Sequence, residues 1–174
     1  MPQLSAEEVV AWLEKTSSEW RALLEQHPEL LLVTCDIAGT RTVGGVLQHI
    51  VAVELRYAER LAGLPATDYR DIPFDSVIAI YATHDRAMQL FEQELAGQQN
   101  WDERIDFVTR TMGPARASRR AVLFHAMLHS IRHYAQLATL VRHTGVKPGW
   151  PMDYLFMDME LVGSTSGTPE QTKH

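Results

Sequence analysis

The sequence contains a single cysteine, Cys35, in 174 residues. One thiol cannot form an intramolecular disulfide, and a metal site built from several thiolates is excluded. We expect Cys35 to be a buried, inert thiol rather than a nucleophile. A chain of this length builds a hydrophobic core without disulfides, so we predict one domain over residues 1–162. The remaining residues, 163–174, are mostly small or polar and are predicted to form a flexible tail.

Long apolar runs are also absent, since no stretch approaches the ~20 residues that span a membrane. The first ten residues, MPQLSAEEVV, lack the basic stretch and apolar core of a secretory signal, so we expect a cytoplasmic protein. There is no excess of basic residues either: 16 Lys and Arg against 22 Asp and Glu give a net charge of −6. This balance argues against nucleic-acid binding.

Four segments show the periodicity of amphipathic helices. Capping residues mark their starts, and Pro or Gly marks their ends. The expected helices run from Ser5 to Pro28, from about Thr42 to Gly63, from near Asp75 to Gly97, and from Ser118 to Gly145. Because each apolar stripe needs a partner, an all-α four-helix bundle is the predicted fold. A long connection of about 20 residues separates the third and fourth helices, and its alternating Ile105, Phe107 and Thr109 predict a short extended segment.

The fourth predicted helix contains three histidines, His125, His129 and His133, at intervals of four residues. Two histidines at this spacing share a helix face and can bind one ion. His125 and His133 lie about 12 Å apart along the axis, so all three cannot easily converge. Either adjacent pair can form the chelate, and His129 belongs to both.

A third ligand must come from another helix, and His49 is the best candidate because it interrupts a strongly apolar stretch. Three neutral histidines would leave a position open for water or substrate, as in catalytic metal sites. The alternative is that these histidines face solvent or form ordinary hydrogen bonds.

Other metal chemistries lack their required residues. Zinc proteases of the HExxH type need Glu directly after the first histidine of the pair, but Ala126 and Ser130 stand there. Ferritin-like di-iron bundles need two Glu-x-x-His motifs on separate helices, and the sequence has none. No Gly-rich phosphate loop is present in the required strand context.

The motifs resemble the DinB (YfiT-like) family of metal-binding four-helix-bundle proteins. The resemblance covers most of residues 5 to 160. The residues that carry it are QHIVAVELRYAERLAG, 48–63, and HAMLHSIRHYAQLATLVRHTG, 125–145, followed by KPGWPMD ending in Asp153. Tyr134 and Ala135 depart from the common Arg-Gly of the family, and we expect them to shape the pocket. Gln136 is retained and could hold a ligand in place or face solvent.

The resemblance implies that His49, His129 and His133 bind the metal, whereas His125 is usually not a ligand. It also implies an up-down-down-up bundle, and the segment from Gly63 to Pro73 is long enough for the crossing between the second and third helices. Zinc or nickel is the expected ion. A homodimer and a small-molecule substrate or thiol are the expected partners, with neither membrane nor nucleic acid.

Two functions follow as hypotheses. The first is a metal-dependent enzyme, similar to thiol-dependent transferases and isomerases, and a hydrolase is also open. The second is a non-catalytic, stress-associated protein in which the ion braces the bundle. A general acid or base beside the metal would favour the enzyme. The sequence offers four candidates for that role, which are Glu54, His84, Asp85 and Asp153.

Overall fold

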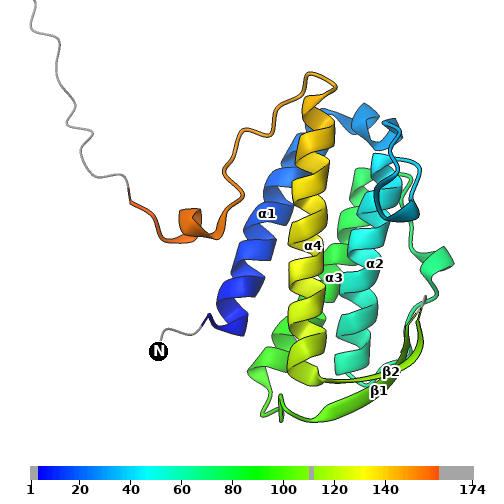
Figure 1. Ribbon diagram of the computed structural model, residues 1–174, viewed down its shortest axis with the longest axis vertical. Coiled ribbons are helices and arrows are strands. Elements are labelled where there is room, and N and C mark those ends of the chain that lie inside the picture. Colours follow the sequence, from blue (N-terminus) through cyan, green and yellow to red (C-terminus); the bar gives the residue numbers. More distant parts are fainter. Residues whose placement is uncertain (1–3, 110–111, 161–174) are drawn as a thin grey trace, which may run out of the picture.

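The computed structural model describes residues 4–109 and 112–160. Within them the four expected helices are present (Figure 1): α1 (Ala6–Gln26), α2 (Val43–Leu61), α3 (Val77–Ala96) and α4 (Arg119–Arg142). A hairpin of two strands, β1 (Arg104–Thr109) and β2 (Gly113–Ser118), precedes α4. Four short 3₁₀ turns complete the elements: Pro28–Leu32, Ile37–Gly39, Tyr69–Asp71 and Tyr154–Met157. The predicted tail, 163–174, lies outside the described residues.

Each long helix begins at a hydroxyl side chain that accepts a backbone N–H of the first turn. Ser5 and Glu8 form the complete capping box that the sequence predicts. Thr42 caps α2 and Ser118 caps α4, as expected. Ser76 caps α3, one residue after the predicted start. These caps satisfy orphan N–H groups and fix where each helix enters the bundle.

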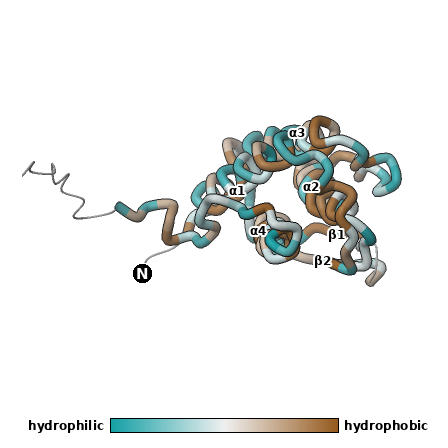
Figure 2. The backbone as a smooth tube through the Cα atoms, turned by 90° about the horizontal axis from the view of Figure 1, so that it is seen from above, coloured by the Kyte–Doolittle hydropathy of each residue, from teal (hydrophilic) through white to brown (hydrophobic). Residues whose placement is uncertain are grey.

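The core lies between the four helices, which surround a common centre when viewed from above (Figure 2). α2 packs against both α3 and α4, and α1 closes the other side. Trp20 of α1 stacks on Tyr134 of α4, with ring centroids 5.8 Å apart. Both rings are fully buried. Aromatic pairs of this size bury a large apolar area and tie the outer helix to the rest.

The segment between α2 and α3 returns along α2. Gly63 adopts a positive φ of 68°, which lets the chain reverse after the helix. The buried carboxylate of Glu59 then accepts hydrogen bonds from the backbone N–H and hydroxyl of Thr67, at 2.7 and 2.6 Å. Further along, the Gln48 side chain donates to the carbonyl of Ile72 at 2.6 Å. The chain therefore enters α3 beside the first half of α2.

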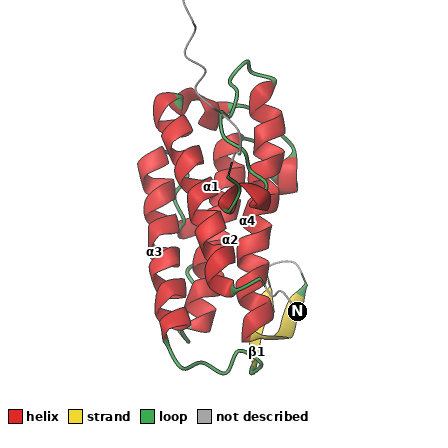
Figure 3. Ribbon diagram, turned by 90° about the vertical axis from the view of Figure 1, so that its left-hand side faces the viewer, coloured by secondary structure: helices red, strands yellow, loops and turns green. Residues whose placement is uncertain are grey.

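The long connection between α3 and α4 folds into the antiparallel hairpin, at one end of the bundle (Figure 3). The sequence predicted an extended segment at Ile105–Thr109 but not its partner strand. Phe107 pairs with Ala115 in the register, and its ring lies 6.0 Å from that of Tyr57 on α2. An isolated two-stranded hairpin is only marginally stable in water, so packing against α2 stabilises this one. In the described part of the chain, no helix has the length and apolarity to cross a membrane.

Candidate metal centre

Three histidines from two helices converge between α2 and α4. His49 lies in the middle of α2, and His129 and His133 lie one turn apart on α4. One ring nitrogen from each lies within 4.8 Å of the others. The Nε2 atoms of His49 and His129 are 3.0 Å apart. His129 and His133 are 8% and 3% exposed, and His49 is half-buried. The structure thus brings together the three residues that the sequence singled out.

His125 lies one turn further along α4, outside this group. Its ring is 5.5 Å from that of His129 and 5.1 Å from that of Tyr57. Among the described residues, the only cluster with metal-ligand geometry contains His129 and His133 but not His125. Of the two adjacent pairs that the sequence left open, His129 and His133 therefore have the geometry of a chelate.

The cluster has the dimensions of a metal site. Nitrogen atoms bound at 2.0–2.1 Å to a tetrahedral zinc ion lie about 3.3 Å apart. The 3.0 Å between the two Nε2 atoms needs only a small adjustment to reach that value. The buried Nδ1 of His129 has no hydrogen-bond partner in the described part of the chain. No hydrogen bond at Nδ1 therefore fixes the orientation of this ring. A bond from Nε2 to an ion would fix it instead.

Gln136 fixes the ring of His133. Its amide oxygen lies 2.7 Å from His133 Nδ1, so we assign the proton to Nδ1 and the lone pair to Nε2. This tautomer is the one that an Nε2 ligand requires. Gln136 is exposed to solvent and also contacts His133, the residue expected to be a ligand. The Arg132 guanidinium lies 3.2 Å from His133 Nε2 and would have to move aside for an ion.

The surroundings keep the α4 histidines neutral. Burial, together with the nearby His133, His49, His125 and Arg132, lowers the pKa of His129 to about 2. Burial also lowers the pKa of His133, with Arg132 adding to the effect and Gln136 opposing it. Neutral imidazole is the form that binds metal. His129 and His133 can therefore bind an ion at neutral pH without first losing a proton.

A cavity of about 210 Å³ lies beside the cluster, bounded by α2, α4 and the hairpin. His49 and His129 form one end of it, and the rest of its wall consists of Ala52, Val53, Arg56, Tyr57, Arg60, Tyr69, Thr109 and His125. None of these lining residues is a carboxylate. The cavity has room for a small molecule next to the nitrogen atoms. The sequence reading missed Arg56 and Arg60, although both fall on the same face of α2 as His49.

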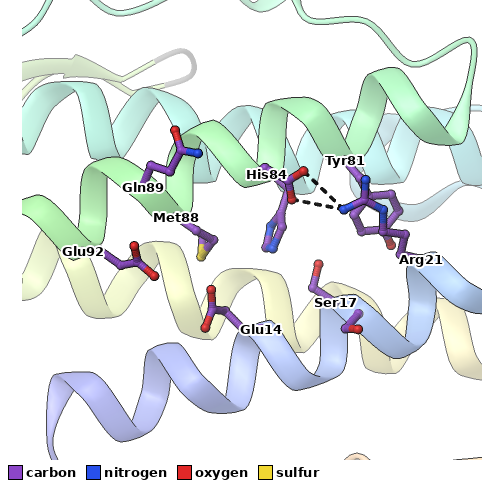
Figure 4. Close-up of a pocket in the computed structure, with 10 residues that line it drawn as sticks. Glu14, Ser17, Arg21, Tyr81, His84, Met88, Gln89 and Glu92 are labelled. Carbon is purple, nitrogen blue, oxygen red and sulfur yellow. Dashed lines mark hydrogen bonds and ion pairs between the residues drawn. The ribbon is translucent and has the colours of Figure 1, made fainter.

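The four residues considered as acids or bases lie elsewhere. Glu54 and His84 pair with each other at 2.7 Å in the core. His84 and Asp85 border a different cavity, of about 420 Å³, between α1 and α3, where Asp85 pairs with Arg21 (Figure 4). Asp153 is exposed beyond α4. None of the four lines the cavity beside the three histidines.

Two further sequence positions are located by the structure. Tyr134 does not line the cavity beside the histidines but lies in the core, where its hydroxyl is 3.2 Å from Ser17 Oγ. Cys35 is half-buried, with its Sγ 3.7 Å from Thr40 Oγ1, and it is not part of the metal-ligand cluster.

Comparison with known families gives one match. The model described as the DinB family matches residues 1–171, which is nearly the whole chain. Comparison with curated proteins gave no match. The description of the family model names no substrate or reaction.

Proposed function

Because the chain belongs to the DinB family, we propose that it binds one divalent metal ion through His49, His129 and His133 and uses the ion to act on a small molecule. The observation that carries this proposal is the convergence of three imidazole nitrogens within 4.8 Å, beside a cavity. Neutral nitrogen ligands suit zinc and nickel, which are the ions we expect.

The reaction that fits best is a thiol-dependent transfer or isomerisation. A bound ion would lower the pKa of a thiol in its open position or polarise a substrate oxygen. The protein's own residues supply the rest of the site. Gln136 holds the proton of His133 on Nδ1, and the cavity walls of α2 and the hairpin enclose the space where a substrate would lie. A hydrolytic reaction would use the same open position.

A non-catalytic role is the second candidate, and one observation favours it. Among the described residues that line the cavity beside the histidines there is no Asp or Glu, so none of them can act as a carboxylate general base. In this role the ion would link α2 to α4 and stabilise the bundle. A stress-associated protein of this kind would need no substrate.

We further propose an up-down-down-up bundle. Support comes from Gln48 of α2, which contacts Ile72 just before α3, and from Arg119 of α4, which donates to Leu61 at the end of α2. These contacts are those expected if α2 and α3 are parallel and α4 is antiparallel to both. A homodimer and a cytoplasmic location stay predictions from the sequence.

Metal analysis of protein purified without an affinity tag tests the central proposal. We expect about one zinc or nickel ion per chain after reconstitution at neutral pH. No bound metal under these conditions would remove the proposal. Thermal melts of the loaded protein with excess chelator at pH 7 then compare the two roles. An ion that braces the bundle binds only the folded state and so raises the melting temperature. A melting temperature that does not change when chelator is added would contradict the bracing role.

A further inference from the structure

Two arginines line the cavity beside the histidine cluster. Arg56 and Arg60 are one helical turn apart on α2, and both are half-buried. Because none of the described residues that line the cavity is Asp or Glu, no carboxylate among them neutralises the two guanidinium groups.

Arg60 is held in place from three sides. It donates a hydrogen bond from Nη2 to the carbonyl of Val108 at 2.8 Å. Its guanidinium also stacks on the rings of Tyr57 and Phe107, at 4.6 and 5.0 Å from their centroids. The carbonyl of Val108 and the Tyr57 hydroxyl are its hydrogen-bonding neighbours, and a guanidinium has five N–H groups, so it keeps donors that these two partners do not use. A guanidinium fixed in this way loses little freedom when it binds an anion.

Arg56 contrasts with the other arginines that border the core. Arg119, which is 8% exposed, is bound to Glu94 and to the carbonyl of Leu61. Within the described residues, Arg56 has no carboxylate at ion-pair distance. Its acidic neighbour Asp68 is already bound by Arg70, at 2.8 and 3.2 Å. Asp68 therefore acts on Arg56 only from beyond ion-pair distance. A half-buried charge with no ion pair is costly, and an anionic ligand would reduce that cost.

The spacing along α2 gives the shape of such a ligand. Arg56 lies about 10 Å along the helix axis from His49, and Arg60 lies one turn further. All three residues line the same cavity. A molecule that reaches both the histidines and the arginines must therefore carry its anionic group several atoms away from the end that approaches the metal site.

We propose that the cavity binds a small molecule with a carboxylate or phosphate group, held by Arg56 and Arg60, whose other end reaches the three histidines. The approach of that end to the ion rests on the proposed function. The anion site itself does not, because it consists of Arg56 and Arg60 and not of the histidines.

Binding of two thiols to cobalt-loaded protein tests the whole arrangement. Mercaptohexanoate and mercaptohexanol have chains of the same length and differ in charge, and thiolate binding changes the cobalt absorption spectrum. We expect the acid to bind about tenfold more tightly or better, the effect of one charge-assisted hydrogen bond. Arg56→Gln should bring the ratio close to one, and Arg60→Gln should reduce it. Arg142→Gln removes an exposed charge at the far end of α4 and should leave the ratio unchanged.

A second measurement separates the anion site from the metal chemistry. Hexanoate and hexanol are titrated into metal-free protein while the Nε–H resonances of Arg56 and Arg60 are followed by NMR. Saturable shifts with hexanoate alone support the anion site even if neither thiol binds cobalt, an outcome that would count against the proposed function. Equal binding of the two thiols, or no shift of either arginine with hexanoate, would overturn the anion site.

Discussion

Two buried histidine sites lie on different faces of α2, and they have opposite electrostatic character. The three-histidine cluster joins α2 to α4 and borders a cavity without carboxylates. The Glu54–His84 pair joins α2 to α3, with Glu54 fully buried and His84 6% exposed. His49 and Glu54 are five residues apart and so point about 140° away from each other around the helix.

The difference shows that a carboxylate partner outweighs burial in setting the charge of a histidine. Burial lowers the pKa of His84, but the charge and hydrogen bond of Glu54 outweigh it, and the pKa is raised overall. Asp85 and Glu14 add to the increase. His129 is buried to a similar extent but has other histidines as neighbours, and its pKa falls to about 2. One site therefore favours a charged imidazole and the other a neutral one.

This contrast assigns different roles to the two sites. A neutral imidazole offers a lone pair to a metal ion. A protonated imidazole that is bound to a buried carboxylate has no lone pair available at the bonded nitrogen. It links two helices through an ion pair instead. We therefore expect metal binding at the cluster and a structural role for the pair.

Substitution of the cluster should have the largest effect. His49→Ala, His129→Ala and His133→Ala each remove a proposed ligand, and we expect each to weaken zinc affinity about 1000-fold or more. Loss of an outer-shell partner alone costs about 10–100-fold, and a direct ligand costs more. Competition with a zinc-binding dye measures the change.

His125→Ala and His84→Ala are the matched controls, since each removes one imidazole from outside the cluster. Both should keep zinc affinity within a few-fold of the original protein. If His125→Ala abolished binding while His133→Ala did not, the choice between the adjacent pairs would be wrong.

Substitution of the pair should affect stability instead of metal binding. Glu54→Gln removes the charge that holds His84 protonated, and we expect a loss of about 2–3 kcal/mol in the free energy of unfolding. This is below the 3–5 kcal/mol typical of a broken buried ion pair, because His84 can lose its proton. Urea unfolding measures the loss, and zinc affinity should not change.

Two further variants sharpen that measurement. Glu92→Gln removes an exposed carboxylate from α3 and should cost less than about 0.5 kcal/mol. The double substitution of Glu54 and His84 by Gln should cost less than the sum of the two single losses, because the partners are coupled. Additive losses would show that the pair contributes no interaction energy.

The helices and the histidine pair could be predicted because they depend on local sequence. Capping residues and apolar periodicity place α1, α2, α3 and α4 to within a few residues. The interval of four residues puts His129 and His133 on one face. His49 was named as the third ligand from its apolar surroundings and from the family resemblance. The structure brings it to the pair, and its ligation stays a prediction.

The arginine-lined cavity and the Glu54–His84 pair could not be predicted because they depend on contacts between distant segments. Arg60 becomes part of a cavity wall only when the hairpin folds over α2, and its bond to Val108 spans 48 residues of sequence. Glu54 and His84 were both proposed as acids or bases near the metal. Helical periodicity gives the face of each residue on its own helix, but the packing of α2 on α3 decides that the two meet.

The smallest effect concerns pH, and it tests the contrast between the two sites directly. The folded pKa of His129 is about 2, well below the ordinary value of 6.5. Between these values the unfolded chain binds a proton that the folded protein does not. Stability of the metal-free protein is therefore lost as pH falls below about 6.5, by about 1.4 kcal/mol per pH unit from this residue. His84 acts in the opposite sense, because its raised pKa stabilises the fold at low pH, and this contribution disappears as pH rises through its folded value.

Histidine NMR titrations of chelator-treated protein between about pH 5 and about pH 8 follow the protonation of both rings. We expect the His129 ring to stay neutral across this range, and the His84 ring to lose its proton above about 6.5. Urea unfolding at about pH 5.5 and about pH 7.5 supplies the energetic counterpart, and His129→Gln should reduce the difference in unfolding free energy between these two pH values by about 1.4 kcal/mol. If His129 titrated above His84, the neighbours would not control the two charges as described, and the reason for placing the metal at the cluster rather than at the pair would be lost.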